Sequence, residues 1–202
     1  MKNLLLFSFL LVINVFSQVK NDDSMFNYYP LKVGNSWLFT SPSNGFSQET
    51  LVKSSSNEKY LVITKSFLGN LSPITKTEIL LLRNNMLLIT ASANDSFGNE
   101  MEEYFEKPII LKFPLSLKQT WKYDLKGKKY KAKVIKKHNS IETPYGTFND
   151  VVEIHIQVND DGFIANKFEF YAFKIGLVKT ETSDSEHGER RPFLYLEKYT
   201  LN

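Results

Sequence analysis

The chain of 202 residues contains no cysteine. Disulfide bonds therefore cannot stabilise it, and no thiolate can bind a metal ion or attack a substrate. A lipid-modified N-terminal cysteine is excluded for the same reason. Histidine is scarce, with three residues, so the sequence offers few ligands for zinc or a similar metal. We expect neither a metal nor a cofactor.

Beyond its N-terminus, the sequence has no apolar run long enough to cross a membrane as a helix. At the N-terminus, Lys2 precedes an apolar run over residues 4–16, and Ser17 ends a cleavage pattern. These features predict a signal peptide over residues 1–17 and export to the periplasm or the extracellular space. The polar residues 18–27 are predicted to form a flexible lead.

A strong net charge is also missing, since the formal charge is +3. This balance gives no sign of a nucleic-acid partner, and export makes such a partner unexpected. The sequence contains no Gly-x-Ser-x-Gly motif and no glycine-rich phosphate loop. Glutamates between residues 100 and 106 could supply an acid and a base, but such clusters are usually solvated. We therefore predict that the protein is not an enzyme.

Aromatic residues are plentiful, at 14% of the chain, and several segments alternate between apolar and polar residues. Val152, Ile154 and Ile156 share one face of an expected strand. Glu153 and His155 share the opposite face, which the alternation predicts to be solvated. Their spacing would suit two metal ligands, but a third ligand is missing.

Runs with strand character recur at short spacing between turn signals, and no segment sustains a helical period. The pattern predicts an all-β protein, an antiparallel meander that forms a strongly curved sheet or an incomplete barrel. Besides a first strand at Trp37, the expected strands cover residues 50–54, 59–67, 75–82, 86–91, 101–105, 120–125, 128–137, 151–158, 167–173, 177–182 and 193–201.

The only two tryptophans occupy equivalent places in two similar stretches, residues 28–39 and 113–123. Both read Pro-Leu-x-(Val/Leu)-x-x-(Ser/Thr)-Trp-x-(Phe/Tyr). We interpret them as an internal duplication within one β domain, residues 28–202, with halves near 28–110 and 111–202. The residues predicted to have a structural role in these motifs are Pro30, Leu31, Gly34, Trp37, Pro114, Leu115 and Trp121.

The first motif, from Tyr29 to Trp37, resembles a Pro-Leu-Lys-x-Gly-x-x-Trp motif of bacterial secreted proteins and lipoproteins of uncharacterised function. Residues 142–148 and 171–179 resemble two later segments of that group. The resemblance implies a curved antiparallel sheet, similar to periplasmic lipoprotein-carrier folds. It also marks two turn glycines, Gly146 and Gly176.

Two lysines depart from the pattern of that group. Lys174 stands where the group usually has a glycine, and Lys118 stands where the second motif would match Gly34 of the first. The turns at both lysines therefore have no sequence-based assignment.

Aromatic residues crowd the C-terminal third. Phe168 and Phe170 share one face of an expected strand, and Tyr171 and Phe173 share the other. Such a strand is either covered on both sides as ordinary core or faces a ligand. We name these four residues as the candidate ligand-binding set.

The function predicted from the sequence is that of an exported, non-catalytic binding protein. It would hold an apolar or lipid-like small molecule in the concavity of the sheet. The alternative is a structural or assembly module of the cell envelope that binds a protein partner.

Overall fold

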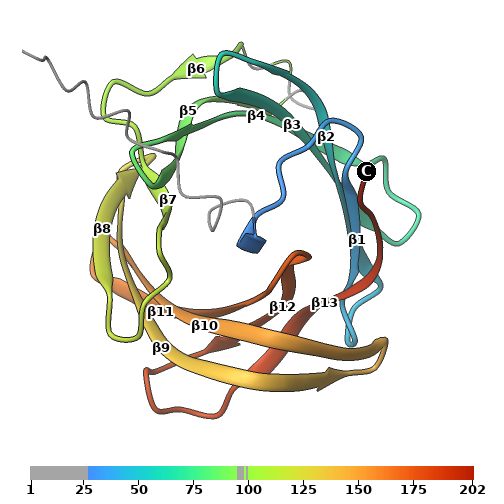
Figure 1. The fold of residues 1–202 in the computed structure, drawn as a ribbon, viewed down its shortest axis with the longest axis vertical. Coiled ribbons are helices and arrows are strands. Elements are labelled where there is room, and N and C mark those ends of the chain that lie inside the picture. Colours follow the sequence, from blue (N-terminus) through green and yellow to red (C-terminus); the bar gives the residue numbers. More distant parts are fainter. Residues whose placement is uncertain (1–26, 95–97, 99) are drawn as a thin grey trace, which may run out of the picture.

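The structure is a computed structural model that describes residues 27–94, 98 and 100–202. The predicted signal peptide, residues 1–17, and most of the predicted lead, residues 18–27, lie outside this described part. Among the described residues, no helix has the length and apolarity needed to cross a membrane. The described chain is built from strands (Figure 1).

The strands, in chain order, are β1 (Ser36–Thr40), β2 (Phe46–Ser56), β3 (Lys59–Leu68), β4 (Ile74–Arg83), β5 (Met86–Asn94), β6 (Glu102–Glu103), β7 (Ile109–Lys112), β8 (Thr120–Leu125), β9 (Lys128–Thr143), β10 (Gly146–Asp160), β11 (Phe163–Ala172), β12 (Gly176–Ser183) and β13 (Arg191–Thr200).

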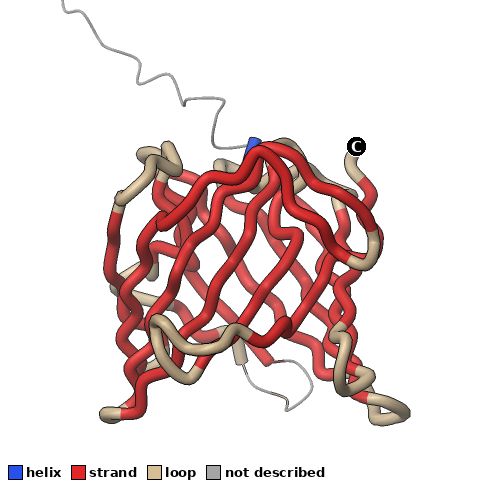
Figure 2. Tube along the Cα trace, turned by 90° about the horizontal axis from the view of Figure 1, so that it is seen from below, coloured by secondary structure: helices blue, strands red, loops and turns tan. Residues whose placement is uncertain are grey.

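These strands form one antiparallel sheet with the order β6-β5-β4-β3-β2-β1-β13-β12-β11-β10-β9-β8, and β7 also pairs with β5. The chain begins at β1 in the middle of the sheet and runs strand by strand to β6 and β7 at one edge. It then crosses to β8 at the other edge and returns strand by strand to β13, which pairs with β1. The sheet curls until β7 and β8 lie side by side, but no ladder joins them (Figures 1 and 2). The predicted fold class, a strongly curved antiparallel sheet, is confirmed.

The seam between β7 and β8 is held by side chains instead of backbone hydrogen bonds. Trp121 of β8 donates its indole N–H to the carbonyl of Ile109 in β7, at 3.0 Å. Near the other end of β8, Lys126 forms an ion pair with Glu102 of β6, at 3.5 Å between Nζ and Oε2. The two ends of the sheet are thus joined at two points that leave β8 without a second ladder.

The alternating residues set which side of each strand faces inward. In β9, Ala132 and Val134 are fully buried, while Lys131 and Lys133 between and before them are exposed. The inward side chains of most strands join one hydrophobic cluster that includes both tryptophans. Burial of this apolar face is the main stabilising term for the fold.

Strand positions follow the prediction, but some lengths do not. The short strand β7 was not predicted, because its four residues carry no period of their own. The β9–β10 hairpin is longer than predicted, because both strands continue up to the predicted turn. In that turn, Thr143 Oγ1 donates to the carbonyl of Gly146 at 3.0 Å. The outer residues of the hairpin are mostly polar, so hydrophobic periodicity gave no sign of the extension.

The two tryptophan motifs make the same backbone hydrogen bonds. In the first, Gly34 N–H donates to the carbonyl of Val52, and Val52 N–H donates to the carbonyl of Asn35, both at 2.9 Å. In the second, Lys118 and Gln119 exchange the equivalent pair with Val134, again at 2.9 Å. Each motif is thus a tucked turn that is hydrogen-bonded to the second strand after it, which is β2 in the first half and β9 in the second. That these matching turns arose by duplication stays a prediction.

The lysines that replace glycine keep the backbone conformation of glycine. Gly34 has φ of 89°, Lys118 has φ of 70° and Lys174 has φ of 63°. A side chain in this left-handed region costs roughly 1–2 kcal/mol relative to glycine. The turns therefore have the geometry that glycine favours, although two of them carry lysine.

Candidate functional site

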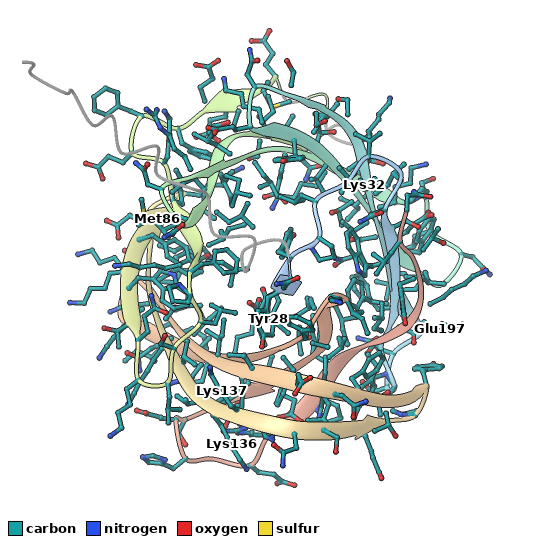
Figure 3. The ribbon with its side chains drawn as sticks, in the orientation of Figure 1. Tyr28, Lys32, Met86, Lys136, Lys137 and Glu197 are labelled. Carbon is teal, nitrogen blue, oxygen red and sulfur yellow. The ribbon has the colours of Figure 1, made fainter. Side chains whose placement is uncertain are left out.

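The interior of the curled sheet contains a cavity of about 260 Å³. Its size is close to the lower end of small-molecule binding sites. Side chains project into this space from both halves of the sheet (Figure 3). Its lining residues are Tyr29, Pro30, Trp37, Phe39, Gln48, Thr50, Val62, Thr64, Lys76, Glu78, Ile89, Ile110, Tyr123, Ile156, Glu169, Tyr171, Gly176 and Leu177.

One part of the cavity wall is apolar and rigid. Trp37 and Phe39 extend inward from β1, and Ile89 and Ile156 extend from β5 and β10. All four side chains are buried. Trp37 is fixed by its indole N–H, which donates to the carbonyl of Ile175 at 2.7 Å. This wall is therefore suited to the apolar part of a ligand.

The segment at residues 27–32 plugs one end of the cavity, and Figure 1 shows it inside the ring of strands. We call this segment the N-terminal plug. Tyr29 lies near both Trp37 and Tyr171, with ring centroids 6.5 Å and 6.4 Å apart. The backbone of the plug is joined to the β11–β12 turn, because Lys174 N–H donates to the carbonyl of Asn27.

Gly176 makes the close contact between the plug and that turn possible. A Cβ atom at this position would lie 3.4 Å from Cδ of Pro30 and 3.6 Å from Nε1 of Trp37, and φ is 98°. Both the crowding and the backbone angle favour glycine here. The predicted structural residue Gly176 thus lies in the cavity wall.

Two carboxylates line the cavity, Glu78 and Glu169, one from each half of the sheet, and each forms a short ion pair. Lys76 Nζ and Glu78 Oε1 of β4 are 2.7 Å apart, and Lys167 Nζ and Glu169 Oε1 of β11 are also 2.7 Å apart. Each pair joins residues i and i+2, which share one face of a strand. Because each carboxylate has its own lysine, the two pairs add no net charge.

Tyr171 completes the polar side of the cavity by donating its hydroxyl to Glu169 Oε2, at 2.7 Å. Burial raises the pKa of Tyr171, and the negative charge of Glu169 raises it further. Burial followed by the charges of Glu78 and Glu169 raises the pKa of Tyr29. Burial, and then Glu169, raises the pKa of Tyr123. All three phenols are thus neutral at physiological pH and able to donate hydrogen bonds.

The structure separates the four aromatic residues that the sequence predicts as a ligand-binding set. Tyr171 lines the cavity. Phe168 and Phe170 are buried on the opposite, convex face of the sheet. Phe173 follows the end of β11, is 37% exposed and packs edge-on against Tyr28 at 5.7 Å. Of this set, Tyr171 alone is placed to meet a ligand in the cavity, and that contact stays a prediction.

The prediction that Glu153 and His155 lie on a solvated strand face is wrong. Both are buried, at 2% and 5% exposure. Glu153 lies 2.7 Å from His138 Nε2 and accepts a hydrogen bond from Arg190 at 2.5 Å. The chain between β12 and β13 supplies Arg190 and covers this part of the convex face.

Phe168 explains why this polar face is buried. His155 stacks on its ring at 4.8 Å, and the guanidinium carbon of Arg190 lies 3.7 Å from its centroid. The ring thus lies between two polar groups, an arrangement that stabilises by stacking and cation–π attraction. Alternation could not reveal it, because the covering residues are distant in sequence.

The sequence interpretation missed the charged residues of the cavity for a related reason. In β11, Lys167, Glu169 and Tyr171 share one face, opposite Phe168 and Phe170. Hydrophobic alternation favours the phenylalanine face as the inner one, whereas the structure places the charged face inside. A signal was available in β4, where Lys76 and Glu78 share a face at the i, i+2 spacing of a strand pair.

Together the fold and the cavity define a class of protein, an open, curled antiparallel sheet around a small cavity of mixed polarity. No family model matches the sequence, and no curated protein matches it.

Two solved structures share the fold. One is a candidate exported protein with a YmcC-like fold from Bacteroides fragilis, with a TM-score of 0.54, 11% identity, and coverage of 87% of this chain and 99% of that one. The other is a candidate lipoprotein from Parabacteroides distasonis, with a TM-score of 0.54, 16% identity, and coverage of 86% and 98%. These likenesses extend over nearly the whole described chain and concern the fold alone.

Proposed function

We propose that this protein is an exported, non-catalytic binding protein that holds a small lipid-like molecule in the cavity of its curled sheet. The observation that carries the proposal is the cavity of about 260 Å³ enclosed by the N-terminal plug and the inner strand faces. Support for export comes from the signal-peptide pattern at residues 1–17 and from the two exported or lipoprotein-like structures with the same fold.

The chemistry of the lining indicates a neutral ligand with an apolar body and a polar head. Trp37, Phe39 and Ile156 offer contact to hydrocarbon, whereas Glu169 and Tyr171 offer hydrogen bonds. The lysine–glutamate pairs neutralise each other, so the cavity does not call for a charged headgroup. A long-chain alcohol or a monoacylglycerol has this chemistry.

Binding of N-phenyl-1-naphthylamine, a neutral apolar fluorophore, tests the proposal. We expect one molecule to bind per chain and a long-chain alcohol to displace it. Thr64→Trp should weaken this binding at least about tenfold, a change of about 1.4 kcal/mol, because Thr64 lines the cavity.

The matched control is Lys65→Trp, which places the same ring on the next residue of β3, where the side chain is exposed. This variant should bind the fluorophore as the unchanged protein does. Equal loss in both variants, or no binding to the unchanged protein, would refute the proposed cavity ligand.

The second candidate function is an envelope assembly module that binds a protein partner. The observation that favours it is the edge of β8, which pairs with β9 and forms no second ladder within the described part of the chain. Lys122→Pro would remove a backbone N–H from this strand. If the module function is correct, this variant should lose a partner captured from envelope extracts, while its fluorophore affinity stays unchanged.

A further inference from the structure

The convex face of β8 and β9 carries a group of exposed lysines, which we call the lysine face: Lys122, Lys129, Lys131 and Lys133. Within the described ranges, none of these four forms an ion pair with an acidic side chain. The register places Lys122 directly opposite Lys131, and Lys129 opposite Asp124. The lysine face is thus a basic patch, and Asp124 is the one carboxylate within the β8–β9 ladder.

The pairing of Lys122 with Lys131 is unfavourable in the isolated protein. Residues directly opposite in an antiparallel pair have Cβ atoms roughly 4.5–5.5 Å apart, and like charges there repel. Next to them, Lys131 and Lys133 line a small hollow of about 60 Å³ together with His155, Gln157 and Glu186. The Glu186 side chain is 51% exposed, and its carboxylate lies 3.9 Å from His155 Nδ1. Among the described residues, Glu186 forms no ion pair with either lysine. A surface of negative charge would relieve this repulsion.

We propose that the lysine face docks this protein on an anionic lipid surface. The lysines would lie over the headgroups. Lysine near an anionic membrane strengthens binding roughly fivefold per residue. This docking does not depend on the proposed cavity ligand, because none of its residues lines the cavity.

The docked orientation would also place the seam at the lipid surface. Ile110 of β7 and Tyr123 of β8 stand on either side of the seam, and both line the cavity. No backbone ladder has to break there for a molecule to pass between the strands. The seam is thus a route between an attached lipid surface and the cavity that crosses no backbone ladder.

Co-sedimentation with vesicles tests the docking. The full chain should bind phosphatidylcholine vesicles that contain about one-third phosphatidylglycerol, should bind pure phosphatidylcholine weakly, and should lose binding as salt is raised. Replacement of Lys122, Lys131 and Lys133 by Gln should reduce partitioning roughly 100-fold, from three fivefold steps.

The matched control replaces Lys53, Lys59 and Lys65 by Gln on β2 and β3, which removes the same charge from another exposed face. This control should bind vesicles as the unchanged protein does. Equal losses in the two triple variants would overturn the docking site, since net charge alone would then explain binding. Tighter binding to heparin than to the vesicles would overturn the lipid surface as the partner.

Two further measurements keep these outcomes separate. Thermal unfolding of each variant reports whether the fold is intact. Binding of N-phenyl-1-naphthylamine should be the same in both triple variants as in the unchanged protein, so failure of docking and failure of the cavity proposal give different results.

Discussion

The two tryptophan motifs adopt the same turn and serve different parts of the molecule. Trp37 lies in β1, in the middle of the sheet, and its indole N–H fixes the β11–β12 turn against the N-terminal plug. Trp121 lies in β8, at an edge of the sheet, and its indole N–H reaches across the seam to β7. The same turn thus lies at the plugged end of the cavity in the first motif, and beside the seam between the two ends of the sheet in the second.

The aromatic residues that flank each tryptophan differ in a complementary way. The first motif has Tyr29 and Phe39 at the positions where the second has Phe113 and Tyr123. Both phenylalanines are buried at 4% exposure, and both tyrosines line the cavity. The tyrosine precedes the proline in the first motif and follows the tryptophan in the second, yet each motif contributes one phenol to the same cavity.

The largest expected effect comes from removing each indole. Trp37→Ala and Trp121→Ala should each destabilise the protein by about 3–5 kcal/mol, because both side chains are nearly completely buried. Denaturant unfolding measures this. The two variants should then differ in hydrogen exchange. Trp121→Ala should accelerate exchange in β7 and β8, and Trp37→Ala should accelerate it in the β11–β12 turn. Losses below about 1 kcal/mol for both would mean that neither indole anchors the fold.

A second test uses the phenols of the two motifs. The folded-state pKa of Tyr29, Tyr123 and Tyr171 is above the ordinary value of 10.0. A raised folded-state pKa gives stability that is complete below the unfolded pKa and is lost as pH rises above it. Stability should therefore fall above a pH of about 10, by up to about 1.4 kcal/mol per unit for each phenol.

The control for this pH dependence is the triple Tyr→Phe variant, which keeps every lysine. It should lose less stability between a pH of about 9.5 and 11, as measured by denaturant unfolding. Single variants at Tyr29 and Tyr123 should each remove a similar share. The same slope in the triple variant and the unchanged protein would show that other groups cause the loss.

A smaller effect on the free energy of unfolding is expected at the turn within each motif, at Gly34 and Lys118. Gly34→Ala should destabilise by about 1–2 kcal/mol, since φ is 89° and the new Cβ would lie 2.5 Å from the side chain of Asn202. Lys118→Gly should stabilise by about 0.5–1 kcal/mol, because it removes the cost of a side chain at a φ of 70°. Opposite signs of the two changes in unfolding free energy are the required result; matching signs would contradict equivalence of the turns.

The sequence was sufficient for the fold class and for most strands, because the period of two is a local signal. Strand β8 has the predicted bounds, and Val152, Ile154 and Ile156 are all buried on one face of β10, as their alternation predicts. It was not sufficient for the inner and outer faces of β11. Two charged residues, Lys167 and Glu169, neutralise each other inside, and Phe168 is covered outside by Arg190, more than twenty residues away. Which face of β11 lies inside therefore depends on residues that are close in space and distant in sequence.

The measurement that tests the central proposal most directly is quenching of tryptophan fluorescence by a bromine-labelled long-chain alcohol. Trp37 lines the cavity and Trp121 does not. In a Trp121→Phe variant, where Trp37 is the only tryptophan, the alcohol should quench the emission with saturation at one molecule per chain. In a Trp37→Phe variant, the emission of Trp121 should be nearly unchanged. Equal quenching of both, or quenching of neither, would contradict a lipid-like ligand in this cavity.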